Sequence, residues 1–92
     1  MQFLISVILS DIEASTPFLN EHLAYLKHYL NNGDFLTYGP YLKTHGGWIL
    51  DQSDSTDTLT ALLSEDPLAR HNLAQYDIQE TAVANISPLL KK

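Results

Sequence analysis

The chain of 92 residues contains no cysteine. This absence excludes disulfides, thiolate nucleophiles, cysteine-based zinc sites and iron–sulfur clusters, and it fits the reducing cytoplasm, where we expect the protein to reside. Basic residues are scarce too: five Lys and Arg stand against eleven Asp and Glu, which gives a formal net charge of -6. Nucleic acids and anionic membranes are bound through clustered positive charge, so we expect neither as a partner.

Long apolar runs and ligand-binding motifs are missing as well. The apolar N-terminal segment, residues 1–10, is too short to span a bilayer as a helix and lacks the flanks of a signal peptide. The four histidines show no H-x-x-x-H or H-E-x-x-H spacing, and no Gly-rich phosphate loop or G-x-S-x-G motif occurs. We therefore expect no metal and no cofactor.

What the sequence does contain is apolar residues at regular spacing along most of its length, which fits one domain over residues 1–92. Phe3 to Leu9 is rich in β-branched residues and apolar on both faces, which predicts a central strand. A polar connection over residues 11–15 is expected to follow it.

The clearest helix is predicted after this connection. Its apolar positions recur with helical spacing and are Leu19, Leu23, Leu26 and Leu30. Thr16 is the expected N-cap, Pro17 suits the first helical position, and Gly33 suits the position just past the end.

The second half of the chain predicts two strands, a helix and a last strand. Residues 35–38 and 48–50 read as a hairpin joined by the Gly-rich turn 43–47, with an edge or a bulge at Gly39-Pro40, because proline cannot donate to a strand ladder. Residues 53–55 are rich in capping side chains and precede a helix that ends at Asp66-Pro67. A short extra turn over residues 68–73 and a strand spanning residues 78–86 complete the expected order.

This order, βαββαβ, predicts an α+β, ferredoxin-like fold: one antiparallel sheet with both helices on one face. The other face then needs a cover, and the same face of a second copy would supply it, so we expect a homodimer.

The residues in this order resemble the YciI-like (YCII-related) family of the dimeric α+β barrel group. The matching features are His22-Leu23 on the first helix, Gly39-Pro40, the Gly46-Gly47 turn and Asp66-Pro67. The resemblance covers nearly the whole chain and implies an active-site pair at His22 and Asp66. Many relatives carry an Arg three positions before the His, where this chain has Leu19.

Both members of the pair have structural alternatives. Helical spacing puts His22 beside the apolar stripe, where it is either an acid–base group facing the sheet or a core-edge histidine with one hydrogen bond. Asp66 either orients the imidazole or caps the short turn that begins at Pro67, and a carboxylate with two oxygens can do both.

Further candidates surround this pair. Tyr25 follows His22 on the helix and either lines a pocket or packs in the core. Ser6 is polar within an apolar strand and would bind a substrate oxygen if it pointed toward His22. Gly39 and Pro40 would shape a pocket rim or form a plain bulge, and His45 lies in a loop that is either solvated or a lid.

These residues and what the family resemblance implies lead us to expect one of two functions. The first is an enzyme that uses the His-Asp pair for an isomerase, lyase or dehalogenase type of step on a small organic acid or lactone. The second is a non-catalytic dimer that binds a small ligand or serves as an accessory module, which Leu19 and the missing cofactor motifs favour.

Overall fold

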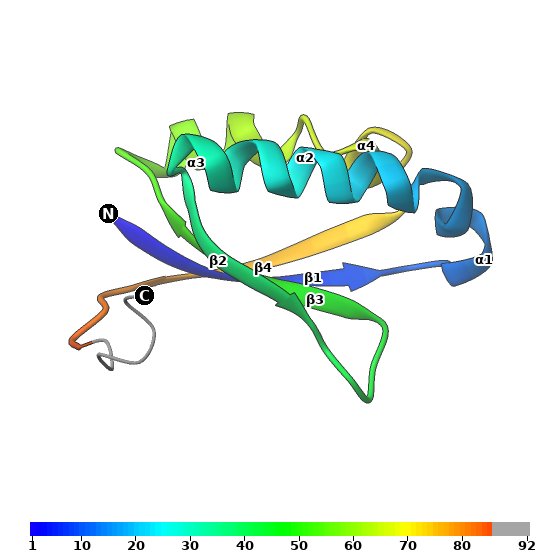
Figure 1. The fold of residues 1–92 in the computed structure, drawn as a ribbon, viewed down its shortest axis with the longest axis horizontal. Coiled ribbons are helices and arrows are strands. Elements are labelled where there is room, and N and C mark those ends of the chain that lie inside the picture. Colours follow the sequence, from blue (N-terminus) through cyan, green and yellow to red (C-terminus); the bar gives the residue numbers. More distant parts are fainter. Residues whose placement is uncertain (86–92) are drawn as a thin grey trace.

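The computed structural model describes residues 1–85 of the chain. A two-layer arrangement is formed by one sheet and the helices that lie on it (Figure 1). The elements in chain order are β1 (Gln2–Leu9), α1 (Ile12–Ser15), the 3-10 turn η1 (Thr16–Phe18), α2 (Leu19–Asn32), β2 (Phe35–Pro40), β3 (Gly46–Gln52), α3 (Thr56–Leu63), α4 (Pro67–Arg70) and β4 (Ala74–Thr81).

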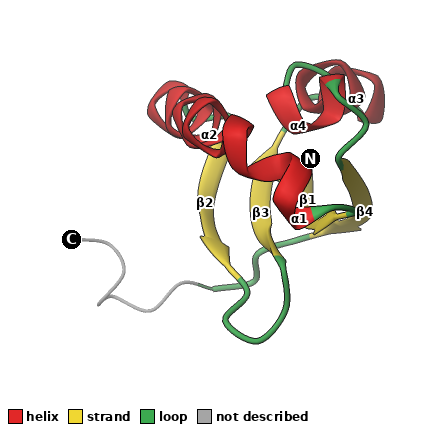
Figure 2. Cartoon of the chain, turned by 90° about the vertical axis from the view of Figure 1, so that its right-hand side faces the viewer, coloured by secondary structure: helices red, strands yellow, loops and turns green. Residues whose placement is uncertain are grey.

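The four strands form one antiparallel sheet in the order β2-β3-β1-β4. The first strand lies in the centre between β3 and β4, as its two apolar faces predict. The helices α2, α3 and α4 all lie on the same side of this sheet (Figure 2). The predicted ferredoxin-like α+β fold is therefore confirmed. Within residues 1–85, none of the helices has the length and apolar character needed to cross a membrane.

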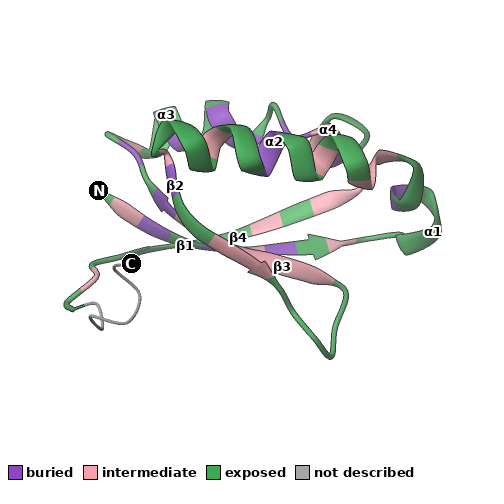
Figure 3. Ribbon diagram, viewed as in Figure 1, coloured by how far each residue is buried: buried purple, intermediate pink, exposed green. Residues whose placement is uncertain are grey.

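The core lies between the sheet and the helices (Figure 3). Phe3, Ile5 and Val7 of β1 are buried there because alternate residues of a strand point to the same face. Leu59, Leu62 and Leu63 of α3 close the core from above, at the spacing of one helical face. The alternate β1 side chains of Leu4 and Ile8 remain exposed on the opposite face of the sheet.

The start of the first helical region differs from its prediction. Asp11 caps α1 by accepting a hydrogen bond from the Ala14 backbone N–H at 3.0 Å, so residues 12–15 are helical where a plain connection was expected. Thr16 already has helical backbone angles, and its hydroxyl donates to the Ile12 carbonyl at 2.9 Å. The prediction that Thr16 is the N-cap is therefore wrong, because the Asp11 carboxylate caps the helical region more than one turn earlier.

The other end of α2 is as predicted. Gly33 ends the helix in the left-handed region at φ 87°, a conformation that glycine adopts without a steric cost. Ser55 caps α3 by accepting from the Thr58 backbone N–H at 3.1 Å, which confirms the cap-rich segment before this helix.

Strand β2 is an edge strand that runs to Pro40, as the proline predicts. The irregularity in its pairing with β3 lies between Phe35 and Thr37 and not at Gly39-Pro40. Proline is tolerated at the end of this strand because its outer edge faces no neighbouring strand in the sheet.

The last strand begins earlier than predicted. Strand β4 spans Ala74–Thr81 and pairs with β1, with Tyr76 opposite Val7 and Ile78 opposite Ile5. Ala82 and Ala84 follow the strand and do not belong to it, and Ile86, the last residue of the predicted strand, lies outside the described residues. The pairing with β1 sets the position of the strand, because it places Ala74, Tyr76 and Ile78 on the side that faces the helices. The small side chains of Ala82 and Ala84 would bury little apolar surface there.

Candidate active site

Asp66 lies at the junction between α3 and α4 with a fully buried side chain. The Asp66-Pro67 dipeptide explains this position, because an extended residue before proline ends one helix and caps the next. The carboxylate oxygen Oδ1 accepts a hydrogen bond from the Leu68 backbone N–H at 3.0 Å. The capping role expected for Asp66 is thus present in the structure.

The same oxygen contacts the ring of His22 on the facing helix. His22 Nδ1 lies 2.8 Å from Asp66 Oδ1, and the imidazole side chain is only 13% exposed. The residues are 44 positions apart in the chain, and the packing of α2 against α4 brings them together. The pair therefore has the geometry that an orienting carboxylate requires.

Tyr76 on β4 provides a third partner, which was not among the residues predicted for the site. Its hydroxyl donates to Asp66 Oδ2 at 2.6 Å. Burial, reinforced by this hydrogen bond, raises the pKa of the Tyr76 hydroxyl, so this group remains a donor. The alternation of Ala74, Tyr76 and Ile78 is the sequence signal that would have placed Tyr76 on the helix-facing side of a strand.

These contacts fix the hydrogen-bonding direction at the imidazole. The ionised carboxylate can only accept, and it accepts from the Leu68 N–H and from the Tyr76 hydroxyl, so Nδ1 of His22 is the donor toward it. In a neutral imidazole Nε2 then carries the free lone pair. This nitrogen is the atom of the ring that is left to meet a ligand.

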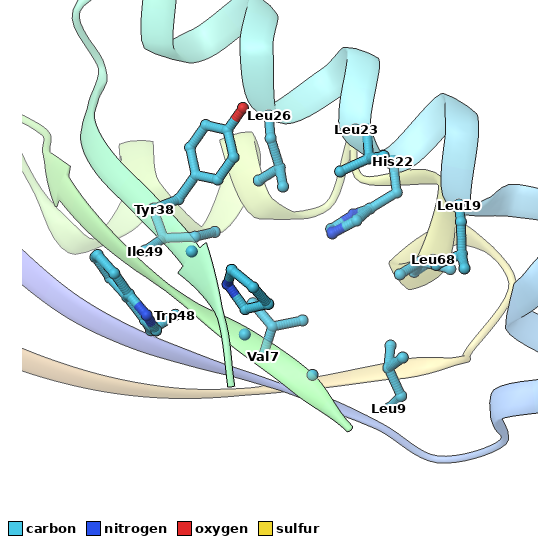
Figure 4. Close-up of a pocket in the computed structure, with 14 residues that line it drawn as sticks. Val7, Leu9, Leu19, His22, Leu23, Leu26, Tyr38, Trp48, Ile49 and Leu68 are labelled. Carbon is cyan, nitrogen blue, oxygen red and sulfur yellow. The ribbon is translucent and has the colours of Figure 1, made fainter. Parts of the chain in front are cut away.

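His22 also lines a cavity of about 230 Å³ between α2 and the ends of β2 and β3 (Figure 4). In Figure 4 its ring projects from the helix toward the strands. The lining is mostly apolar and comprises Val7, Leu9, Leu19, His22, Leu23, Leu26, Tyr38, Gly39, Pro40, Gly46, Gly47, Trp48, Ile49 and Leu68. A concave apolar site with a few polar groups is the usual form of a small-molecule site.

Gly39 and Pro40 belong to this lining, at the end of β2. A Cβ atom on Gly39 would lie only 2.9 Å from Cζ2 of Trp48, so the indole packs directly on the strand backbone. Gly46 has φ 125°, and a Cβ there would overlap the Val7 carbonyl oxygen. The glycines thus permit the close approach of the strands that bounds the cavity.

Two of the candidate ligand-binding residues lie away from the cavity lining. Ser6 alternates with the buried Ile5 and Val7 and so points to the opposite face of the sheet, where its hydroxyl lies 2.7 Å from the Tyr41 hydroxyl. Tyr25 is buried, and its hydroxyl donates to the Leu62 carbonyl at 2.9 Å. Burial, followed by the negative charge of Asp66, raises the pKa of this hydroxyl, so Tyr25 stays protonated as a core residue.

The remaining histidines lie outside this arrangement. His45 is exposed in the turn between β2 and β3, and His71 stacks on Phe18 with 4.1 Å between the ring centroids. Within residues 1–85 no group of three or more His, Asp or Glu side chains is placed to hold a metal ion.

Comparisons with known proteins agree with this arrangement of the chain. A family model described as the YCII-related domain matches residues 1–82. A comparison with curated proteins found no match.

Two solved structures share this ferredoxin-like α+β fold. One is 5-chloro-2-hydroxyhydroquinone dehydrochlorinase from Burkholderia phenoliruptrix AC1100 in complex with 2,5-dihydroxybenzoquinone, with 19% identity, 89% of this chain and 94% of that chain covered, and a TM-score of 0.77. The other is muconolactone isomerase, with 12% identity, 96% of this chain and 95% of that chain covered, and a TM-score of 0.75. At these identities the likeness establishes the shared fold.

Proposed function

The chain belongs to the YCII-related family, and we propose that it is a small-molecule enzyme in which His22 transfers a proton to and from a ligand in the cavity. The observation that carries this proposal is the 2.8 Å contact between His22 Nδ1 and the buried Asp66 carboxylate. Because Asp66 holds Nδ1, the free Nε2 is the atom that takes the proton. The carboxylate then stabilises the imidazolium, as the third group of a catalytic triad does.

The reaction class follows from what one base can do on a small molecule. His22 removes a proton from an acidic carbon, and the electron pair of the C–H bond forms a new double bond. If a leaving group departs from the neighbouring carbon, the step is a lyase or dehalogenase reaction; if the imidazolium returns the proton to another carbon, the step is an isomerisation. The similar fold of a dehydrochlorinase and of an isomerase supports these classes.

The proposed substrate is a small organic acid or lactone, and the proposed location is the cytoplasm. A cavity of about 230 Å³ fits a molecule of roughly one ring, because an engineered cavity of about 150 Å³ accommodates benzene. The absence of cysteine from the whole chain is in keeping with a reducing compartment.

Proton transfer is tested by deuterium incorporation. The wild type is incubated in D₂O with a panel of small lactones, cyclic ketones and small carboxylic acids, and exchange at the acidic carbon is followed by NMR. We expect His22→Ala to lower the exchange rate by about 10²- to 10⁴-fold, the usual contribution of a general base. His28→Ala is the matched control, because His28 is an exposed histidine on the same helix. Equal exchange by both variants would contradict the proposal.

The second candidate is a non-catalytic module that binds a small ligand. The observation in its favour is that Leu19, Leu23 and Leu26 present only apolar atoms to the cavity beside His22. Ligand affinity that survives His22→Ala, together with no exchange by the wild type across the panel, would favour this candidate over the enzyme.

A further inference from the structure

The cavity beside His22 has no charged side chain in its lining other than His22 itself when that ring is protonated. Ten of the other lining residues are aliphatic or aromatic, and three are glycines. Of the five Lys and Arg residues, Lys27, Lys43 and Arg70 lie in the described part of the chain, and none of them belongs to the lining. Among residues 1–85, an anionic group on a ligand would therefore meet no fixed positive charge there.

The His22 ring does not supply the missing charge. When it is protonated, its charge is already matched by Asp66 at 2.8 Å, so the pair is neutral as a whole. Transfer of a carboxylate from water to an apolar site without a partner is strongly unfavourable. The formal net charge of -6 also opposes the approach of an anion.

We propose that this cavity selects uncharged, ring-sized molecules over carboxylates, so that of the two substrate classes considered above the lactone type is the one that fits. This inference rests on the proposed function for its choice of site, and it restricts the class of ligand that the site binds. The uncharged ring packs against the apolar lining, and its acidic C–H or O–H group meets Nε2 of His22.

The test uses two pairs of probes that differ mainly in charge. One pair is phthalide, an aromatic lactone, and its ring-opened form 2-(hydroxymethyl)benzoate; the other is 4-hydroxybenzamide and 4-hydroxybenzoate. Binding to the full chain is measured by NMR titration. We expect the uncharged member of each pair to bind at least about tenfold more tightly, because the carboxylate loses its hydration without gaining a partner.

A charge added at the rim provides the matched variant. Leu23 lines the cavity and is 54% exposed, so Leu23→Arg adds a cation at the site with little risk to the core. Leu42→Arg adds the same charge in the β2–β3 loop, where Leu42 is 94% exposed and does not belong to the lining. We expect Leu23→Arg to reduce the preference for uncharged probes at least about threefold, and Leu42→Arg to leave it unchanged.

Three results would overturn the inference: carboxylates that bind the wild type as tightly as their uncharged partners, a preference that Leu23→Arg and Leu42→Arg change equally, or no binding of any probe at about 10 mM. The proposed function fails separately. A preference for uncharged probes without His22-dependent exchange would leave the ligand class standing and contradict catalysis. His22-dependent exchange that favours carboxylates would support catalysis and contradict the proposed ligand class.

Discussion

At the residue scale, Asp66 combines a structural role with the proposed catalytic one. Its buried carboxylate accepts from the Leu68 backbone, from His22 and from Tyr76. Three donors offset the cost of burying the charge, and they also fix the direction of the carboxylate plane. The cap of α4 therefore holds the imidazole in place, so the two roles expected for Asp66 belong to one arrangement.

Tyr76→Phe removes one of these donors and keeps the ring that packs beneath the helices. We expect the free energy of unfolding to fall by about 1.5–3 kcal/mol, the usual value for a hydrogen bond to a charged group. We also expect slower deuterium exchange, because Asp66 loses a partner that orients it. Urea denaturation and the exchange assay measure the two effects.

Tyr29→Phe is the control for this substitution. The Tyr29 hydroxyl also donates to a carboxylate, Glu65, at 2.7 Å, but this contact is exposed and includes neither His22 nor Asp66. An exposed contact of this kind contributes less than about 1 kcal/mol. If both variants lost equal stability and kept full exchange, Tyr76 would have no positioning role.

A second buried carboxylate predicts a pH effect on stability. Asp51 is fully buried; Oδ2 accepts from the Ser53 hydroxyl at 2.7 Å, and Oδ1 has no partner among the described residues. Burial raises the pKa of Asp51, against the lowering effect of that hydrogen bond. A raised pKa means that the folded state favours the protonated form, so this contribution to stability is present at acidic pH and is lost as pH rises through the folded-state pKa.

Asp51→Asn removes this titration. We therefore expect the variant to be more stable than the wild type at neutral pH, and the difference to shrink as pH falls from the raised folded-state pKa of Asp51 to the ordinary Asp value, below which it stays constant. Thermal unfolding of both proteins from acidic to neutral pH measures it. A difference that stays constant over this range would show that Asp51 is not the group responsible.

At the scale of elements, the end of β2 packs against β3 through Gly39 and the indole ring of Trp48. Gly39→Ala would place a methyl group 2.9 Å from the Trp48 ring, so the ring or the strand must move. We expect a loss of about 1–3 kcal/mol, the usual cost of overpacking. Trp48 is the single tryptophan of the chain, so its fluorescence emission reports the shift directly.

Gly33→Ala separates this steric effect from that of backbone conformation. Gly33 has φ 87°, and no atom lies within 4 Å of the position that a Cβ would take, so alanine there meets only backbone strain of about 1–2 kcal/mol. The tryptophan emission of this variant should match that of the wild type. A similar change of emission in both variants would contradict the contact between Gly39 and Trp48 as the cause.

At the scale of the whole molecule, the uncovered face of the sheet predicts a homodimer. Leu4 and Ile8 are 43% and 47% exposed there, and none of the described helices covers this face (Figures 1 and 2). We expect a sedimentation mass of twice 10.3 kDa for the wild type, and a monomer for Leu4→Lys. Leu42→Lys, in the exposed loop, should stay dimeric. A monomeric wild type, or equal dissociation of both variants, would contradict the prediction.

How far the sequence predicts this structure depends on whether a signal is local. The spacing of the apolar residues in β1 and α2 is local, and both β1 and the end of α2 are where it places them, although the helical region begins earlier, at Ile12. The alternation near residues 78–86 is weak and predicts β4 too late in the chain, because the position of this strand is set by its pairing with β1. The alternation of Ala74, Tyr76 and Ile78 indicates the face on which Tyr76 lies, but only the pairing with β1 shows that its hydroxyl reaches Asp66.

The face of a strand is equally hard to assign from local pattern. Ser6 lies in a strand that is apolar on both sides, so the sequence could not decide which side it faces. His22 and Asp66 were found through the family resemblance, and only the packing of α2 against α4 shows how they meet.

The proposed proton transfer requires that Asp66 holds Nδ1 of His22, so that Nε2 is free to accept a proton. Nitrogen-15 NMR of the imidazole, at a pH where the ring is neutral, measures this arrangement, because the two ring nitrogens have different shifts when protonated. We predict a protonated Nδ1 and an unprotonated Nε2 in the wild type, and a mixture of the two forms in Asp66→Ala. A wild-type ring that carries its proton on Nε2 would contradict this role of Asp66.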